Sequence, residues 1–577
     1  MQFPSFIVKV KSWHYALLLL VLFVTIVAVV SDKLHHYPYG DGPEYILMTE
    51  ALHNHASPEI RQSDIDSYMD YLQKNDFQIH RKRLFLNLQD SIASDKDEYN
   101  GFFRTNQGDY YSYHFWLYSL VNVPARALLS SWNGDIRSTF FITNLFIMFF
   151  GLWLISRLRE VTKGYRTVLS LLLIFSPMLW YLDWAHAEVW GGVLTFLGVL
   201  LFFVKRRYSS LLAFSLAAVH YPPLFIPALV VFVEILIVED IKWKVLVKLF
   251  FSSFWIVVPS IFYLIHFGTP SLIADSGNLS TEVVDLRRLF NFFFDLDQGM
   301  ILVIPLILLT MIGVFIYDLI RQRFNRMYLM LLSILLMSII FMQMINWSHT
   351  HAVANRYTVW TSAIVIVVLF ARLSKLKKGA FYSIFGLLII SQSLVVFLQY
   401  DFTKITWDVN RFNSISTWVL NNHPSWYNPD PYVFMTRNSE FELSTTDSVM
   451  IYTNEENRIV KMLVYNGAIW QLEYRGVDRE VLEELNPGFD YYHGYAYLNP
   501  DDLEALGYEQ DQDTLVHYIE RTRKEELKKK ILEDILNSPE WYEGIRVYAV
   551  EEGIPLDSAL KENVDYMYWK GKQDAQN

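Results

Sequence analysis

The sequence predicts a polytopic α-helical membrane protein with an acidic α+β domain after residue 400. Three observations predict this fold class. Of the 577 residues, 53% are hydrophobic and 19% are charged, a balance too apolar for an ordinary soluble enzyme. Long apolar runs recur along residues 1–400, and about 20 such residues cross a ~30 Å hydrocarbon core. The charge is also uneven, because residues 401–577 carry a net −16 and residues 1–400 a net +5.

The composition excludes several kinds of site and partner. The chain contains no cysteine, so disulfides, thiol nucleophiles, cysteine-ligated zinc and iron–sulfur clusters are all excluded. The acidic segment 401–577 has no polybasic face for nucleic acid or anionic lipid. We therefore expect no nucleic-acid partner.

Eleven apolar segments are predicted to cross the membrane. The first, 13–30, follows Lys9 and Lys11, and no small-x-small cleavage site comes after it, which indicates an uncleaved signal anchor. The other ten are residues 138–156, 167–182, 186–204, 208–220, 222–238, 246–266, 299–319, 327–346, 357–371 and 380–398.

The distribution of basic residues orients these segments. With the N-terminus in the cytoplasm, the short inner connections contain 19 Lys and Arg and the outer ones only 4. This count requires that residues 114–131 do not cross, and Pro124 and Arg126 interrupt that segment, as expected at the membrane interface. We therefore expect a multi-pass protein of the inner (plasma) membrane. Its first outer loop covers 31–137, and residues 401–577 lie outside the cytoplasm.

Ionisable residues that lie outside the inner basic loops gather on the predicted outer side. A transporter more often places such groups at the midplane, in broken helices of repeated halves, and the sequence has no internal repeat. The pattern favours a site at the outer membrane face. Its candidate members are Asp41, Glu44, Asp183, His186, Glu188, His220, Asp295, Asp297, His349, His351 and Arg356.

Two acids, Asp41 and Glu44, open a predicted helix directly after the first span. One interpretation is an N-cap, in which Asp41 caps the helix and Glu44 reaches back as in a capping box. The other interpretation makes one of these carboxylates a general base at the membrane face. The two interpretations are compatible, and the pattern leaves both open.

Five stretches occur in order on the predicted outer side: Tyr39-Gly-Asp-Gly-Pro-Glu44, Gly108-Asp-Tyr-Tyr-Ser-Tyr-His114, Tyr181-Leu-Asp-Trp-Ala-His-Ala-Glu-Val-Trp190, Asp295-Leu-Asp-Gln-Gly299 and Asn355-Arg-Tyr357. Together they resemble the GT-C superfamily of integral-membrane glycosyltransferases, whose relatives include protein mannosyltransferases and lipid A aminoarabinose transferases. The likeness covers residues 10–400. The family often has two adjacent acids in its first loop, whereas here Gly42 follows Asp41, so the choice of base between Asp41 and Glu44 stays open.

The resemblance implies an inverting hexosyl- or pentosyltransferase of cell-envelope glycan biosynthesis. It would transfer a sugar from a polyprenyl-phosphate donor to a lipid, glycan or protein acceptor on the extracytoplasmic face. Such a donor is already activated, and the chain has no phosphate-cradling GxxxxGK[ST] loop. Asp41 or Glu44 would take the acceptor proton, and Arg356 would hold the departing phosphate. The implied substrate contacts are His114, His186, Glu188, Asp295, Asp297, Gln298, Arg356 and Tyr357.

Four of these contacts have a structural alternative. His186 and Glu188 lie where one span turns into the next, so they could form a hydrogen-bonded corner. Asp295 and Asp297 could be loop or N-cap carboxylates for a helix that begins near Gly299.

The cationic and metal-binding candidates also have alternatives. Arg356 could anchor a span at the headgroups, and Arg287 and Arg288 are lower-ranking candidates for the donor phosphate. No cofactor or metal site is predicted, because His349 and His351 at i, i+2 are a poor helical pair without a third ligand nearby. Dependence on a divalent metal stays open.

Residues 401–577 are predicted to form a small α+β domain with a helical end. Strand patterns occur at 432–435, 448–452 and 458–464, separated by Asn, Asp and Pro turns. After Thr514 the pattern becomes helical, with Ile519, Leu527, Ile531 and Ile535 on one face and two short helices joined at Gly553 further on. The segment has no catalytic pattern.

Two other classes of function are compatible with the same features. A transporter or flippase of a lipid-linked substrate would need a polar path at the midplane and would work without the outer carboxylates. A nonenzymatic assembly protein would use the acidic domain to recruit partners.

The basic-residue count makes a testable prediction about topology. Reporter domains fused after Tyr400 or within residues 55–100 should be active only outside the cytoplasm, and reporters fused at 160 or 375 only inside it. Fusions to paired alkaline phosphatase and green fluorescent protein reporters measure this directly. A cytoplasmic signal from the 55–100 fusion would contradict both the topology and an outer site at Asp41.

Overall fold

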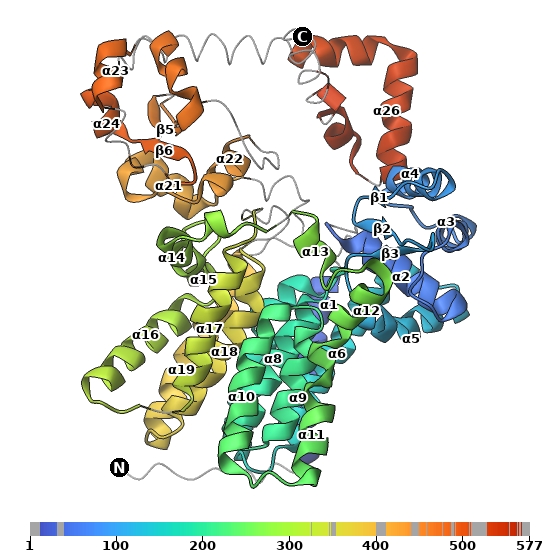
Figure 1. Ribbon diagram of the computed structural model, residues 1–577, viewed down its shortest axis with the longest axis vertical. Helices are drawn as coiled ribbons and strands as arrows, with labels where there is room; N and C mark the ends of the chain where they lie inside the picture. Colours follow the sequence, from blue (N-terminus) through green and yellow to red (C-terminus); the bar gives the residue numbers. More distant parts are fainter. Residues whose placement is uncertain are drawn as a thin grey trace.

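The computed structural model is mostly helical and contains two small three-stranded sheets (Figure 1). It describes residues 12–31, 40–277, 279–324, 326–345, 347, 354–399, 411–439, 449–456, 458–475, 477–485, 490, 492–506, 508, 528–552, 554–561, 563, 564 and 567. His349, His351, Ile519, Leu527 and Gly553 lie outside the described residues.

The apolar half of the chain contains α1 (Ser12–Ser31), α6 (Thr139–Arg157), α7 (Lys163–Ile174), α8 (Glu188–Phe203), α9 (Arg207–Ala218), α10 (Phe225–Val238), α11 (Trp243–Ser253), α12 (Val258–Phe267), α15 (Met300–Val303), α16 (Pro305–Ile320), α17 (Tyr328–Phe341), α18 (Tyr357–Leu373) and α19 (Lys378–Leu394). Residues 40–137, which belong to the predicted first outer loop, contain α2 (Gly42–His55), α3 (Gln62–Lys74), α4 (Lys82–Ala93), β1 (Glu98–Tyr99), β2 (Phe102–Arg104), β3 (Tyr110–Ser112) and α5 (Leu117–Ser131).

A later connection contains α13 (Leu272–Asp275) and α14 (Leu286–Phe294). The C-terminal elements are α21 (Ser414–Asn422), α22 (Pro431–Ser439), β4 (Met450–Thr453), β5 (Ile459–Tyr465), α23 (Arg479–Leu485), β6 (Tyr495–Leu498), α24 (Pro500–Ala505) and α26 (Pro539–Glu552). Short 3₁₀ turns are η1 (Ile136–Ser138), η2 (Pro177–Tyr181), η3 (Pro222–Leu224), η4 (Phe254–Ile256), η5 (Thr281–Val283), η7 (Pro424–Trp426) and η8 (Asn466–Arg475), and η6 (Val395–Gln399) is a π-helix.

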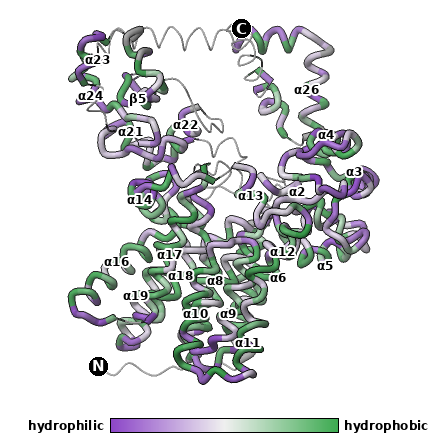
Figure 2. Tube along the Cα trace, in the orientation of Figure 1, coloured by the Kyte–Doolittle hydropathy of each residue, from purple (hydrophilic) through white to green (hydrophobic). Residues whose placement is uncertain are grey.

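Two helices among the described residues are long and apolar enough to cross a membrane, Ile136–Arg157 and Lys378–Leu398. A third candidate is the pair Trp243–Ile256 and Val258–Phe267, which is bent by 53°. Several shorter apolar helices accompany them. Figure 2 shows hydrophobic residues concentrated on α8 to α11 and α16 to α19, and hydrophilic residues on α3 and α4.

Each of the eleven predicted segments overlaps a helix or a pair of helices, but several helices are shorter than a full crossing. Proline explains part of this division. Helix α7 ends before Pro177, and α16 begins at Pro305 after the short α15. Proline lacks the N–H donor and disfavours a helical residue before it, so an apolar run that contains proline divides there. The structure supports an apolar helical half, and eleven crossings stay a prediction.

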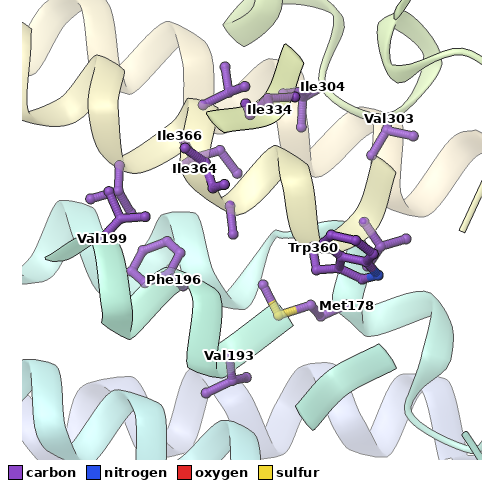
Figure 3. Close-up of a cluster of buried hydrophobic side chains, with 14 of the residues drawn as sticks. Met178, Val193, Phe196, Val199, Val303, Ile304, Ile334, Trp360, Ile364 and Ile366 are labelled. Atoms are coloured by element: carbon purple, nitrogen blue, oxygen red, sulfur yellow. The ribbon is translucent and has the colours of Figure 1, made fainter. Parts of the chain in front are cut away.

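Helix α18 lies at the centre of this half. Every residue from Thr358 to Ala371 is buried, as expected of a helix that is apolar on all sides. Fully burying one Val, Ile or Leu side chain contributes roughly 1.5–3 kcal/mol, so the position of α18 is strongly determined. Arg356, which directly precedes this helix, is therefore held in place. Figure 3 shows the packing of α18 against α8, with labelled side chains that include Trp360, Ile364, Phe196 and Val199.

The first outer loop packs as a small helical layer on one side of the bundle (Figure 1). Its helices α2 and α5 are joined by a buried, bidentate pair in which Arg126 Nε and Nη2 donate to Glu50 at 2.5 and 2.8 Å. Helix α5 has 15 residues and contains Pro124. Arg126 thus faces a protein partner, which explains how a charge is tolerated within this apolar segment.

The C-terminal sheet has the strand order β4, β5, β6, and both pairs are antiparallel. The strands predicted at 448–452 and 458–464 overlap β4 and β5. The strand predicted at 432–435 is wrong, because these residues lie in α22. Asp430 Oδ1 accepts from the Tyr432 N–H at 3.0 Å, and Pro431 begins the helix. This N-terminal signal outweighs the strand propensity of Tyr-Val-Phe.

A buried ion pair attaches the C-terminal elements to the apolar half. Arg288 Nε on α14 donates to Asp430 Oδ2 at 2.9 Å, and both side chains are 0% exposed. Arg288 Nη1 also donates to the carbonyls of Met342 and Met344, and its guanidinium lies 4.8 Å from the ring of Trp347. At the other end of the chain, α26 packs on α4.

Two adjacent arginines offer a matched test of this attachment. Arg288→Ala leaves Asp430 buried without its cation, so we expect a loss of about 3–5 kcal/mol. Arg287→Ala removes an exposed pair with Asp490 and should cost less than about 1 kcal/mol. Chemical unfolding in detergent measures both, with proteolysis of the C-terminal segment as a second readout. Equal effects of the two substitutions would contradict the assignment of Arg288 as the buried anchor.

Candidate functional site

The Asp41 carboxylate is the point at which distant segments of the chain meet. Tyr113 Oη donates to Asp41 Oδ1 at 3.2 Å, and His114 Nε2 lies 3.1 Å from Oδ2. Arg356 Nη1 donates to the same Oδ2 at 3.3 Å, and His186 Nδ1 lies 3.9 Å away. These partners come from the β3–α5 connection, the start of α18 and the turn before α8. Four of the five stretches singled out in the sequence thus converge on one carboxylate.

The N-cap interpretation of Asp41 is wrong. Asp41 does precede α2, but its side chain makes no capping hydrogen bond to the helix. Its oxygens accept instead from Tyr113 and Arg356. The helix starts without a side-chain cap because Pro43, in the first turn, has no N–H to satisfy. The carboxylate is therefore held by residues from outside α2.

Glu44 lies one turn along α2 from Asp41, and its side chain is 8% exposed. Ser112 Oγ donates to Glu44 Oε2 at 3.4 Å, and His114 Nε2 lies 3.5 Å from the same oxygen. The imidazole of His114 therefore lies between the two carboxylates. Tyr45 stacks on the His114 ring with centroids 4.9 Å apart.

The pKa values of the two carboxyl groups are shifted in opposite directions. Burial raises the pKa of Asp41, but His114, Arg356 and His186 outweigh it and hold the pKa well below its usual value. Burial and the adjacent Asp41 raise the pKa of Glu44 well above its usual value. Asp41 therefore favours its ionised form, and Glu44 is more readily protonated than an ordinary glutamate. Carboxyl pairs divided in this way occur where one group acts as an acid or donor and the other as a base.

A hairpin turn that the sequence analysis does not predict packs directly against Glu44. Strands β1 and β2 pair Tyr99 with Phe102, which leaves Asn100 and Gly101 as a two-residue turn. Both turn residues have positive φ, 42° and 81°, as a type I′ turn requires. A Cβ on Gly101 would lie only 2.5 Å from Glu44 Oε1. The signal was present in the sequence, because Asn-Gly between apolar residues is the strongest short hairpin pattern.

His186 and Glu188 are buried beside this site. Their side chains are 4% and 1% exposed, and His186 Nδ1 lies 3.7 Å from Glu188 Oε2. This Glu188 oxygen has no hydrogen-bond partner among the described residues. A separation of 3.7 Å is longer than a hydrogen bond, so the hydrogen-bonded corner stays a prediction, and His186 also lies in the cluster around Asp41.

Arg356 directly precedes the buried helix α18, and the packing of this helix places Arg356 at the site. Its Nε is buried without a hydrogen-bond partner in the described part of the chain. Its guanidinium lies 5.9 Å from the ring centroid of Tyr357, which stacks on Phe341. A cation that pairs with Asp41 through one nitrogen retains donors for an anionic ligand.

Asp295 and Asp297 lie where the connection between α14 and α15 contacts the C-terminal elements, and we call this contact the Asp295 joint. Asp295 Oδ1 accepts from the backbone N–H groups of Asp297 and Gln298, at 2.7 and 2.8 Å, and from Tyr427 Oη at 3.0 Å. Asp297 Oδ2 accepts from Arg437 Nε at 2.6 Å. Among the described contacts, neither carboxylate reaches Asp41.

The loop interpretation of these two acids is therefore the correct one, and their role as N-caps is not, since Gly299 precedes α15. The joint still borders the site through the backbone. The carbonyl of Gln298 accepts from the N–H of Asn355 at 2.9 Å, directly before Arg356.

Arg287 and Arg288, the lower-ranking candidates for the donor phosphate, form ion pairs away from Asp41. Arg288 is paired with Asp430 and Arg287 with Asp490, and no described contact connects either to Asp41. No group of three His, Asp or Glu side chains among the described residues is placed to hold a metal ion. 

A cavity of about 340 Å³ borders Glu44 and Tyr113 on the side of the first outer loop. Arg81, Glu98 and Asn100 also line it. The site thus combines two carboxyl groups with pKa values shifted in opposite directions, an arginine and an adjacent cavity.

The sequence matches no protein-family model and no curated protein, and the structure matches no solved structure.

The Asp295 joint predicts a pH dependence of stability. Burial and the neighbouring Asp297 raise the pKa of Asp295 from 3.8 to about 7. Between these values the folded protein holds a proton that the unfolded chain has lost, so the free energy of unfolding falls as the pH rises from about 4 to about 7. Asp295→Asn keeps an acceptor oxygen and cannot titrate, so it should flatten this slope.

Thermal unfolding in detergent across this pH range measures the effect. Asp70→Asn, an exposed substitution on α3, is the control and should retain the slope. An unchanged slope in Asp295→Asn would show that the dependence arises elsewhere.

Proposed function

We propose that the protein is a multi-pass membrane glycosyltransferase of GT-C type that acts on the extracytoplasmic face. In this proposal the chain crosses the membrane eleven times, with a cytoplasmic N-terminus, and uses a polyprenyl-phosphate sugar as donor. The observation that carries it is the convergence of Tyr113, His114, His186 and Arg356 on the carboxylate of Asp41. This combination supplies a base and a phosphate-binding cation in one place.

The proposed reaction is a single displacement. The acceptor oxygen attacks the anomeric carbon, and the bond from that carbon to the phosphate oxygen breaks with its electron pair leaving on the phosphate. The hydroxyl proton passes to Asp41, and the anomeric configuration inverts. No further reactant is needed, because the donor phosphate is the leaving group.

Arg356 suits the departing phosphate. A guanidinium binds phosphate through two parallel N–H groups, and its positive charge stabilises the charge that develops on the leaving oxygen. Arg356 also helps to hold the pKa of Asp41 low. When the phosphate engages Arg356, Asp41 loses part of this stabilisation and becomes a stronger base. Donor binding would thus prepare Asp41 for the acceptor.

Asp41 is the better candidate for the base, and Glu44 for a neutral hydrogen-bond donor. The raised pKa of Glu44 favours its protonated form, and that form cannot accept the acceptor proton. A protonated carboxyl can instead donate to a substrate oxygen. His114 lies between the two carboxyl groups and orients both.

The test compares two isosteric substitutions. Asp41→Asn keeps the shape and the contact from Tyr113 but cannot accept the proton, so transfer should fall by ~10²–10⁴-fold. Glu44→Gln removes a group that is proposed to donate a hydrogen bond and not to accept the proton, so its loss should be less than about tenfold. The assay follows sugar transfer in proteoliposomes, with a panel of synthetic polyprenyl-phosphate hexoses and pentoses.

Arg356→Lys is the matched test of the donor side. It retains the charge but loses the planar fork, so the KM for the donor should rise. If Asp41→Asn and Glu44→Gln both transfer at wild-type rates, the outer site is not catalytic. Movement of an intact lipid-linked substrate by these variants would then favour the transporter.

A further inference from the structure

The cavity beside Glu44 is lined by residues from several segments of the chain. Glu44 and Tyr113 form the end nearest Asp41, and Tyr113 bonds to Asp41 directly. The turn residues Asn100 and Gly101 also line the cavity, as does Ser276, just after α13. In Figure 1 the hairpin, α2 and α13 lie together at one end of the helical bundle.

The cavity and Arg356 approach the carboxylates from different sets of elements. The cavity lining comes from the first outer loop and from Ser276, and includes no residue of α8 or α18. Arg356 and His186, by contrast, come from those two helices or the turns before them. A donor phosphate on Arg356 would leave the cavity free for the second substrate. This separation is what a direct displacement between two substrates requires.

The lining indicates the chemistry of that second substrate. Arg81, Glu98 and Asn100 offer both hydrogen-bond donors and hydrogen-bond acceptors. Phe103 and Tyr113 add aromatic surface. A single arginine beside two acids is not a phosphate-binding cluster. A polar lining also disfavours an acyl chain. Mixed polar groups beside aromatic rings suit a ring that carries many hydroxyls. The volume of about 340 Å³ is at the small end for ligand pockets.

We propose that this cavity is the acceptor subsite and that it binds the terminal sugar of a neutral glycan. The inference rests on the proposed function and adds the class of acceptor. The reacting hydroxyl would enter past Tyr113 and Glu44 to reach Asp41, and Asn100 and Glu98 would hold the other hydroxyls. Arg81 Nη1 donates to the carbonyl of Gly40 at 3.2 Å, which connects the cavity wall to the segment that carries Asp41.

Two substitutions test the subsite at lining residues from separate segments of the chain. Asn100→Gly removes the side-chain amide, and glycine tolerates the positive φ of this turn. Ser276→Trp places an indole in the cavity from an exposed position. We expect the KM for a glycan acceptor to rise at least about tenfold in both, while the KM for the donor changes less than about twofold. Asp70→Asn, remote from the cavity lining, should change neither KM.

A binding experiment without donor separates this inference from the proposed function. Saturation-transfer NMR with a panel of neutral disaccharides should show contact with the wild-type protein, and Ser276→Trp should abolish it. This result would support the sugar subsite even if no donor in the panel reacts. Disaccharide contact that Ser276→Trp leaves intact would overturn the subsite. Transfer to a serine-containing peptide or to a lipid, unaffected by either substitution, would overturn the glycan class while leaving glycosyl transfer standing.

Discussion

The parts of this structure are connected by the groups that stabilise one largely buried negative charge, the carboxylate of Asp41. A carboxylate removed from water is costly unless cations or donors surround it. Asp41 meets this requirement with His114, His186 and Arg356, and none of these belongs to its own helix. The first outer loop must therefore stay against the helical bundle for the charge to be stable. The same contacts create a site in which an ionised carboxylate and an arginine lie side by side.

The apolar core supplies the precision of this arrangement. Helix α18 is buried on all sides and packs on α8, so the residues just before each helix are brought to the same end of the bundle (Figure 3). Arg356 precedes α18, and His186 precedes α8. Packing of apolar side chains thus determines where the polar ones meet. The polar cluster around Asp41 lies at helix ends, where the chain leaves the core and polar groups are tolerated.

Buried charges also attach the C-terminal elements. Asp430 pairs with Arg288, and Asp297 with Arg437, so each pair has one member before residue 400 and one after it. Such pairs add specificity of attachment, because removing one partner leaves a buried charge. They also explain why Asp295 and Asp297, which resemble site residues in the sequence, take a structural role. Their neighbour Gln298 still contacts the Arg356 segment through the backbone.

The sequence alone determined the apolar helical half and the approximate positions of its helices, because hydrophobic runs are a local signal. The family resemblance also indicated Asp41, His114, His186 and Arg356 as site residues, but it did not single out Tyr113. The sequence also contained the Asn100-Gly101 hairpin signal, although the wall that this turn forms beside Glu44 depends on the fold. Only the tertiary structure showed that Asp41 contacts distant residues instead of capping its helix, that residues 432–435 are helical and not a strand, and that Asp295 contacts the C-terminal elements. Each of these findings depends on which distant group lies within hydrogen-bond distance, and local sequence does not carry that information.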